Sequence, residues 1–547
     1  MWKILLSLLL CMSFLPFGQA SANTTFTSVS AGNEHTVAID STGSVWAWGS
    51  NMNGSLGDGT TTAHLRPIKV PGLTDITAIS ASGNFTLALK NDGTVYAWGM
   101  NYNGQLGNGT SNNVQLVPLQ IPGLDHVIAI EAGNGYSMAL KDDGKVYTWG
   151  LNNNGQLGDG TTDSKSTPVQ VLNISNAKKI SAGHSHAMAL IDDKTVYAWG
   201  DNQVGQIGNG TINARQLTPV KIGISGITSI SAGGAHSLAV KEDGTVYGWG
   251  RNVIGEVGDG TTNMRALPVV INSLTGIGIT SVETGTTHSL AIQNDGTVWG
   301  WGDNQFGQLG DESSTPRLTP VKMKTSKAAT IISSSFVHSM IVYNDGTIWG
   351  TGRNNGGQLG IGSYSDSNKL VQVAFASTDA NLSNLVLSTG QLTPPFSSNT
   401  TSYTMNVNNE VESISLTPTA SSANATITVT VNSGNPINVT SGQQFGPFAL
   451  NVGENQVSVK VTAEDGLQTK TYTVVITRAP INHAPVANAG SYQTTQDVAV
   501  TGTLIATDSD SDPLTYSIVS NGSLGVVNIT NTATGAFTYT PNNGATG

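Results

Sequence analysis

Residues 132–161 read AGNGYSMALKDDGKVYTWGLNNNGQLGDGT, and this pattern recurs along the first 376 residues of the chain. A Trp-Gly pair ends a predicted strand in each copy but the last, where Thr351-Gly352 takes its place. The pairs begin at positions 48, 98, 149, 199, 249, 301 and 351, so the spacings are 50, 51, 50, 50, 52 and 50 residues. A period of this length is typical of repeat architectures.

Each copy parses into four short strands. An Asp-Gly turn such as Asp143-Gly144 joins the second strand to the third, because these residue types tolerate positive φ. A second aromatic residue stands two positions before each pair, on the same strand face, so we expect the aromatic pairs to pack between stacked sheets. The fourth strand often begins at a Pro, such as Pro168. Seven sets of four antiparallel strands are best satisfied by radial closure, which predicts a seven-bladed β-propeller.

The repeat A-G-x-x-H-S-x-A-L…D-G-x-V-Y-x-W-G-x-N-x-x-G-Q-L-G resembles the regulator of chromosome condensation repeat, in seven copies over about residues 26–376. The resemblance implies a seven-bladed propeller within residues 23–376. A fold of this kind does not by itself imply an activity.

Composition and charge narrow the classes of partner. Only 11% of the residues are charged, and the formal net charge is −11. An acidic chain without a basic stripe lacks the phosphate-neutralising surface that nucleic-acid binding needs, so we expect no nucleic-acid partner. The hydrophobic residues are spread out, and no apolar run after residue 20 is long enough to span a bilayer.

Residues 1–22 have the features of a secretory signal peptide, with Lys3, an apolar run and a small-residue cleavage site ending at Ala22. The only cysteine, Cys11, lies inside this segment, so the mature chain has no disulfide and no thiol nucleophile. We therefore predict an exported bacterial protein, located outside the cell, on its surface or in the periplasm.

Histidines recur in one column of the repeat, where two copies carry Phe85 and Tyr136 instead. A metal or catalytic ring would not tolerate an aromatic hydrocarbon in one member, so we expect these histidines to pack and to hydrogen-bond a turn inside each blade. The Asp in N-x-x-G-Q-L-G-D-G-T alternates with Asn between copies, which fits a turn-forming role. No catalytic constellation stands out, and we predict that the protein is not an enzyme. The histidine column is His35, His186, His236, His288 and His338.

The end of the long loop varies between copies, three residues before the Pro of the fourth strand. We predict that this column forms a polar, partly cationic ring on one face, where loops on a rigid scaffold would bind a partner. Solvated loop residues are the alternative. The column is His64, Gln115, Lys165, Gln216, Arg265 and Arg317.

Two further modules follow the repeats. Residues 379–478 resemble the bacterial cadherin-like β-sandwich domain, with Pro395-Phe396 and Tyr403 among the matching residues, and their alternating strands agree with a sandwich. Residues 483–547 resemble the start of a bacterial Ig-like or cadherin-like repeat and predict an incomplete second sandwich. There Asp508, Asp510 and Asp512 could supply oxygen ligands to Ca²⁺, with an acidic turn as the alternative. The fold class is therefore all-β, and no other cofactor is expected.

Three functions remain open, of which a propeller hydrolase or lyase has no residue constellation behind it. The first is an exported, non-enzymatic recognition or adhesion scaffold: a monomer whose propeller binds a protein or glycan partner outside the cytosol, with the sandwiches as spacers. The alternative is guanine-nucleotide exchange on a small GTPase, an activity that the eponymous member of the resembled family performs. The export signal and the absence of a basic tail argue against exchange.

Overall fold

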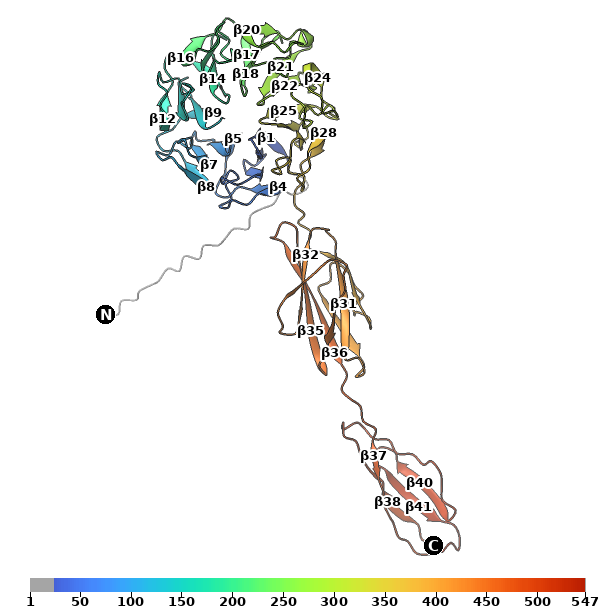
Figure 1. The fold of residues 1–547 in the computed structure, drawn as a ribbon. Coiled ribbons are helices and arrows are strands. Elements are labelled where there is room, and N and C mark those ends of the chain that lie inside the picture. The colour runs from blue at the N-terminus through green and yellow to red at the C-terminus, as the bar shows by residue number, and fades with distance from the viewer. Residues whose placement is uncertain (1–23, 547) are drawn as a thin grey trace, which may run out of the picture. The chain divides into compact units, whose positions relative to one another are not determined.

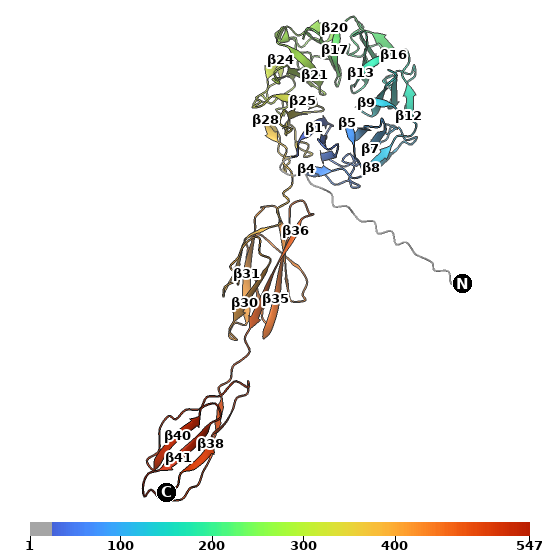
Figure 2. The same cartoon turned by 180° about the vertical axis from the view of Figure 1, so that it is seen from behind.

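A computed structural model describes residues 24–546, and the chain divides into two compact units at residues 376 and 377. Figure 1 shows the first unit as a closed ring of sheets, and Figure 2 shows the same ring from behind. The predicted signal peptide, residues 1–22, lies outside the described residues. Within residues 24–546 no helix is long and apolar enough to cross a membrane.

Each repeat forms one blade, a four-stranded sheet in which consecutive strands are neighbours. The first four blades consist of β1 (Phe26–Ala31), β2 (His35–Asp40), β3 (Val45–Gly49) and β4 (His64–Lys69); β5 (Ile76–Ser82), β6 (Phe85–Lys90), β7 (Val95–Asn101) and β8 (Asn113–Gln120); β9 (Val127–Ala132), β10 (Tyr136–Lys141), β11 (Val146–Gly150) and β12 (Lys165–Gln170); β13 (Ala177–Ala182), β14 (His186–Ile191), β15 (Val196–Gly200) and β16 (Gln216–Lys221).

The remaining blades follow the same order, with a short 3-10 helix, η1 (Asn272–Leu274), between the fifth and the sixth. The first strand of each blade lies nearest the axis and the fourth lies at the rim (Figure 1). The strands are β17 (Ile227–Ala232), β18 (His236–Lys241), β19 (Val246–Gly250) and β20 (Arg265–Val270); β21 (Ile279–Thr284), β22 (His288–Gln293), β23 (Val298–Gly302) and β24 (Arg317–Lys322); β25 (Ala329–Ser334), β26 (His338–Tyr343), β27 (Ile348–Gly352) and β28 (Ser367–Gln372).

The hairpin between the second and third strands is the predicted Asp-Gly turn. In the sixth blade Gly296 has φ of +83°, and its amide donates to the carbonyl of Gln293 at 2.9 Å. The Asp295 carboxylate accepts from the amide of Thr297 at 2.8 Å. The hairpin sets the register that places Trp301 opposite Ser289.

The repeated tryptophans hold neighbouring blades together, as the sequence predicts. Trp301 is fully buried, and its indole Nε1 donates to the main-chain oxygen of Glu256 in the preceding blade at 2.9 Å. Trp98 packs in a core cluster with residues of the first blade, such as Val37. In the last blade Thr351 replaces the indole and donates to the oxygen of Gly307 at 2.8 Å. The aromatic column therefore lies between the blades.

The ring closes by packing the first blade against the last, without exchange of a strand between their sheets. The amide of Ala31 donates to the hydroxyl of Ser333 at 3.0 Å, and Trp48 donates to the oxygen of Gln358 at 2.8 Å. Phe26 stacks on Phe375 with ring centroids 5.5 Å apart. These contacts repeat at the closure the kind of contact that joins sequential blades.

The second unit begins with two facing sheets around one core that includes Tyr403, Tyr472 and Leu382. β30 (Ser402–Val407) and β36 (Thr469–Arg478) pair in parallel, whereas the other strands pair antiparallel. One sheet has the order β29 (Leu382–Leu387), β31 (Ser413–Ala420) and β34 (Phe445–Ala449); the other has the order β30 (Ser402–Val407), β36 (Thr469–Arg478), β35 (Gly453–Thr462), β32 (Thr426–Val431) and β33 (Ile437–Val439).

The last module has two small sheets and little buried apolar surface. Phe537 is the only buried hydrophobic residue that residues 480–546 contribute, and Tyr492 packs edge-on against it at 5.0 Å. The sheets are β37 (Val486–Asn488) with β39 (Ile505–Thr507), and β38 (Val500–Thr503), β41 (Ala536–Pro541) and β40 (Gly525–Asn531). The chain is thus all-β, with a seven-bladed propeller followed by sandwich-like sheets, which confirms the predicted fold class.

Candidate partner-binding face

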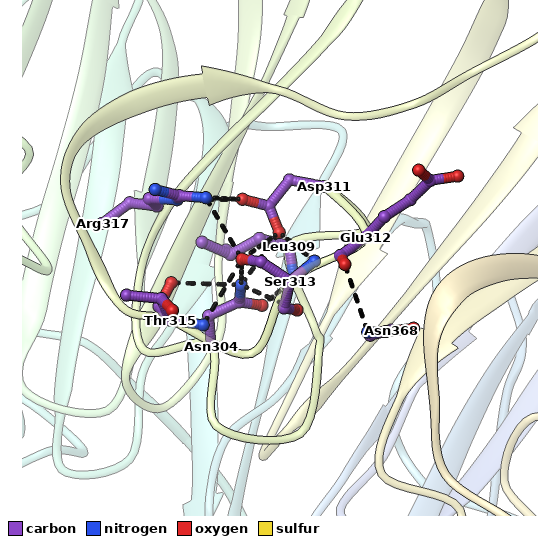
Figure 3. A network of polar contacts seen from close by, with 8 residues as sticks. All are labelled: Asn304, Leu309, Asp311, Glu312, Ser313, Thr315, Arg317 and Asn368. Carbon is purple, nitrogen blue, oxygen red and sulfur yellow. Dashed lines mark hydrogen bonds and ion pairs between the residues drawn. The ribbon is translucent and has the colours of Figure 1, made fainter.

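The loops that join strands one to two and three to four of every blade emerge on the same end of the propeller, which we call the loop face. Each long loop is organised by one asparagine, illustrated by the sixth blade in Figure 3. The Asn304 amide donates to Asp311 at 3.0 Å and to the oxygen of Ser313 at 3.2 Å, while its own oxygen accepts from the amide of Leu309 at 3.0 Å. One buried side chain therefore fixes both ends of the loop.

This asparagine occupies the same place in every blade and has no solvent exposure. A buried amide that satisfies several main-chain groups makes its loop rigid, because each bond would be lost together with the others. The asparagines are Asn51, Asn101, Asn152, Asn202, Asn252, Asn304 and Asn354.

The predicted partner-binding column lies at or near the start of each fourth strand, and its basic residues pair with the loop aspartate of their own blade. The Arg317 guanidinium donates to Asp311 at 2.6 Å (Figure 3), and Arg265 lies 2.5 Å from Asp259. His64 lies 3.0 Å from Asp58, and the pair of Lys165 with Asp159 is looser, at 3.9 Å.

Uncharged members of the column occur where the loop carries no acid. Asn108 and Asn209 replace the aspartate in the second and fourth blades, and glutamine stands at the column position there. Gln115 donates to the oxygen of Val117 at 3.0 Å, and Gln216 to the oxygen of Ala214 at 3.5 Å. In these six blades, a basic column residue therefore stands where the loop carries an aspartate, and a glutamine stands where the loop carries an asparagine. This pairing gives the column a role within each blade, and its role in partner binding stays a prediction.

The ion pairs alter the titration of the loop acids. Burial alone would raise the pKa of Asp58, yet hydrogen bonds from His64, Thr60 and Asn51 lower it to about 2. Asp311 follows the same logic: burial opposes the charge, but Ser313, Arg317 and Asn304 together hold its pKa below the usual value. Both acids are therefore ionised at neutral pH, and they hold the loop as hydrogen-bond acceptors.

The histidine rings pack against the turn of their own blade, as His35 does against Gly32, but their side-chain hydrogen bonds run between blades, which corrects the expected hydrogen bond to the turn. The His236 Nε2 lies 2.9 Å from the hydroxyl of Ser289 in the next blade, and His338 closes the ring by contacting Thr36 at 3.2 Å. The hydroxyl of Ser237, which follows His236, lies 2.8 Å from Nε2 of His186 in the preceding blade. Each hydroxyl lies one position after a column residue, so only the stacking of blades brings it to its partner.

These histidines are neutral, and each forms its side-chain hydrogen bond through Nε2, while the buried Nδ1 has no hydrogen-bond partner among the described residues. Burial lowers the pKa of His186 to about 3, with a small further lowering by His184, so the imidazole carries no charge at neutral pH. His184 itself bonds Thr286 at 3.1 Å. Across residues 24–546, no group of three or more His, Cys, Asp or Glu side chains is arranged to hold a metal ion.

The sequence analysis missed a second variable column on the loop face, directly after each buried asparagine. Met52, Tyr102 and Val253 occupy it, with exposures of 80%, 52% and 51%. Phe336, on a short loop of the same face, is 37% exposed. The signal lay in the first variable position of N-x-x-G, which is large and apolar or aromatic in three copies and polar in the other four.

The three predicted Ca²⁺ ligands lie in a turn of the last module. The Asp508 carboxylate accepts from the amides of Asp510 and Asp512, at 2.8 and 3.3 Å. The Asp510 carboxylate lies 3.0 Å from Nδ1 of His483. The acids thus bond the turn and a neighbouring histidine, and Ca²⁺ binding stays a prediction.

Comparison with known proteins agrees with these features. Residues 13–276 match the RCC1-like domain, and residues 279–308 and 295–342 match the regulator of chromosome condensation (RCC1) repeat. Residues 382–479 match the cadherin-like beta sandwich domain, and residues 482–547 match the bacterial Ig domain.

Two of the curated relatives match short stretches of this chain. Human E3 ubiquitin-protein ligase HERC2 is 29% identical over 137 residues, which are 24% of this chain but 3% of that protein. A putative membrane protein of Evansella cellulosilytica is 35% identical over 104 residues, covering 19% of this chain and 15% of the relative. The chain therefore covers only a small part of these relatives.

Solved structures match the propeller over more of their length. Prp20p of Saccharomyces cerevisiae, whose structure was described together with its binding properties to Gsp1p and histones, is 26% identical with a TM-score of 0.50, covering 57% of this chain and 80% of that chain. Human WBSCR16 is 22% identical with a TM-score of 0.54, covering 62% and 96%, and shows the fold alone. The chain thus consists of an RCC1-like domain with RCC1 repeats, followed by a cadherin-like β-sandwich domain and a bacterial Ig domain.

Proposed function

We propose that this protein is an exported, non-enzymatic recognition scaffold whose propeller binds a protein or glycan partner through the loop face, with the sandwich domains as spacers. One observation carries the proposal: Met52, Tyr102 and Val253 are exposed at equivalent positions, each next to a buried asparagine that fixes its loop. Side chains held on a rigid scaffold lose little conformational entropy on binding. Aromatic residues and Met are enriched in protein interfaces, which favours a protein partner.

Capture of binding partners tests the face. Native protein would be crosslinked to surface and culture-fluid components of the producing cells, beside a Met52→Ser, Tyr102→Ser, Val253→Ser variant. We expect the bands captured by the native chain to disappear with the variant, because the apolar anchors are gone. The matched control replaces three exposed apolar residues of the outer strands and should capture normally: Val117→Ser, Leu119→Ser and Leu267→Ser. Equal loss in both variants, or persistence in both, would contradict the proposed face.

The predicted basic column needs a gentler substitution in the same assay. A reversal of Arg265 or Arg317 to Glu would place a carboxylate beside Asp259 or Asp311 and disturb the loop itself. Arg265→Gln and Arg317→Gln remove the charge and keep a hydrogen-bonding side chain, as Gln115 and Gln216 do in sister blades. Capture that is unchanged by both substitutions would leave the column with its role inside the blade alone.

Export is supported by the signal-peptide pattern of residues 1–22 and by the bacterial Ig domain. The name of the Evansella relative, a putative membrane protein, agrees with a location outside the cytosol. Protease added to intact producing cells should degrade the propeller if it lies outside the cell. Protection that persists after the outer envelope is opened would contradict export and favour a cytosolic role.

Guanine-nucleotide exchange is the second candidate, because Prp20p, at 26% identity, was studied for its binding to Gsp1p. The assay is release of labelled nucleotide from a panel of small GTPases in the presence of the full chain. Accelerated release from any member would support exchange, and release unchanged across the panel would remove this candidate.

A further inference from the structure

The wall of the central channel carries one column of residues that faces the propeller axis, one residue from the first strand of each blade. Five blades place a serine there, whereas the third and sixth blades place Glu131 and Glu283. With seven blades, these two are three apart in one direction and four in the other, so they stand on opposite sides of the channel. The serines are Ser30, Ser80, Ser181, Ser231 and Ser333.

The serines have a clear structural role. The Ser80 hydroxyl accepts from the amide of Ala132 in the next blade at 2.9 Å, and Ser181 accepts from Ala232 at the same distance. A serine in this column therefore joins neighbouring innermost strands. A glutamate is longer and negatively charged, so the two exceptions do not follow from this structural role.

The column lines a polar cavity of about 120 Å³. Both glutamates belong to its wall and are partly exposed to it. At about 30 Å³ for each water molecule, the cavity has room for about four waters or for an ion with part of its hydration shell. Its wall offers carboxylate, hydroxyl and main-chain oxygens, which are the ligands that hard cations prefer.

A buried hydroxyl without a partner lies in the same wall. Ser334 is 7% exposed, and its Oγ has no hydrogen-bond partner in the described part of the chain. One blade earlier, Thr284 holds the equivalent position and contacts the hydroxyl of Ser231 at 2.7 Å. By the repeat, the residue that Ser334 faces in place of Ser231 is Glu283. The wall thus holds a hydroxyl without a partner in the blade that follows the one with Glu283.

Burial favours the protonated form of both glutamates. Burial raises the pKa of Glu131 to about 7, against a lowering contribution from Ser80, and burial together with the charge of Glu131 raises the pKa of Glu283. His184, at the wall, is held neutral by its own burial. Lys179, which precedes Ser181 by two residues on the same strand face, donates to the oxygen of Thr228. Among residues 24–546, neither glutamate forms an ion pair.

We propose that Glu131 and Glu283 form a binding site for a hydrated divalent cation in the central channel, with the Ser334 hydroxyl and water completing the ligands. Two carboxylates match the charge of such an ion, and a site held by one or two carboxylates with retained water is typical of Mg²⁺. The ion would link the third blade to the sixth across the ring. This inference does not depend on the proposed partner-binding function.

Intrinsic tryptophan fluorescence reports the unfolding of the propeller alone, because the last tryptophan of the chain is Trp349 and the second unit has none. The full chain would be unfolded by heat in MgCl₂, in CaCl₂ and in NaCl of equal ionic strength, after removal of metal with chelator. We expect the fluorescence midpoint to rise with at least one divalent salt over NaCl, because a ligand that binds only the folded state stabilises it. Binding should also release protons and strengthen as the pH rises from 6 to 8.

The variant that removes the site restores the residue of the sister blades: Glu131→Ser with Glu283→Ser. It is expected to fold, since five blades carry serine there, and to lose the divalent-specific rise and the proton release. Glu242→Gln, at an exposed glutamate of the fifth blade paired with Lys194, is the control and should keep the full response. The inference is overturned if the native chain shows no divalent-specific rise, or if the double serine variant keeps it.

Discussion

The two ends of the propeller differ in where their polar side chains lie and in what those side chains bond. On the end opposite the loop face, the hairpins between strands two and three carry charges that pair in solvent, such as Lys241 with Asp243 at 3.1 Å. We call this end the turn face. On the loop face the polar groups are buried or half-buried and bond main chain, as Asn304 and Asp311 do, while apolar side chains such as Met52 are exposed.

The difference follows from the length of the connections. A short Asp-Gly hairpin needs only one side chain to satisfy its main chain, such as the Asp295 carboxylate that accepts from the amide of Thr297, so its other side chains remain in solvent and can carry charges. A loop of more than ten residues needs buried side chains to satisfy its amides and carbonyls. Once Asn304 and its counterparts do this, the residues beside them are rigid and free to vary. The loop face is therefore the end suited to recognition.

The largest expected effect is the loss of a loop asparagine. Asn304→Ala removes the acceptor of the Leu309 amide and the donor to Asp311, leaving buried groups without partners. We expect the free energy of unfolding to fall by about 1–3 kcal/mol, measured by denaturant unfolding followed by tryptophan fluorescence. Gln305→Ala, the exposed neighbour, is the control and should unfold like the native chain. Equal free energies of unfolding for Asn304→Ala and Gln305→Ala would contradict the structural role of the buried loop asparagine.

The channel and the loop face should respond to pH with opposite signs. The folded-state pKa of Glu131 is raised to about 7, so its stabilising contribution is present at acidic pH and is lost as the pH rises through 7. Asp58, with a pKa lowered to about 2, contributes above pH 4 and loses its contribution as the pH falls towards 2. In the absence of divalent cations, Glu131→Gln should therefore unfold at a higher temperature than the native chain at pH 8.

Asp58→Asn provides the opposite limb of the same measurement. It should match the native chain at pH 2 and be less stable at pH 7, because the native carboxylate has hydrogen bonds that only its charged form makes strong. Parallel pH profiles for the Glu131 and Asp58 variants would show that burial in the channel and hydrogen bonding on the loop face are not the separate causes described above.

A smaller effect should separate the ion pairs of the two faces. The Arg317 pair engages a nearly buried Asp311, which is 6% exposed, so Arg317→Gln should lower the free energy of unfolding by about 0.5–1 kcal/mol. Lys90→Gln breaks an exposed pair with Asp92 on the turn face and should leave the denaturation midpoint unchanged. If Lys90→Gln lowered the free energy of unfolding more than Arg317→Gln, the ion pairs of the loop face would not be the more stabilising ones.

The smallest effect concerns the acidic turn of the last module. If Asp508, Asp510 and Asp512 bind Ca²⁺, the ion should protect this module of the native chain against proteolysis. An Asp510→Ala variant should lose this protection, and its propeller fluorescence should be unaffected. Protection that persists in Asp510→Ala would assign it to other groups. The readout is fragment mass after limited digestion, because tryptophan fluorescence does not report this module.

Much of the fold could be predicted because its signals are local. The spacing of Trp-Gly pairs, the Asp-Gly turns and the two-residue alternation each act within one blade, and the blades formed as expected. The candidate site was harder. The column that includes Arg317 looked free in the sequence, since nothing there shows that its guanidinium folds back on Asp311, six residues earlier, instead of pointing to solvent. The exposed Met52 column went unnoticed because large apolar residues are expected to be buried.

By itself, the sequence determined the number of blades, their strands and the positions of the aromatic and histidine columns, because these depend on period and residue type within some fifty residues. Only the tertiary structure decided which atoms those columns bond. His236 meets Ser289, Trp48 meets Gln358 and Glu131 shares a channel with Glu283 only after the ring has closed. The physical reason is that a polar side chain takes the partner that packing brings within hydrogen-bond distance, and here that partner lies one blade, or the whole ring, away along the chain.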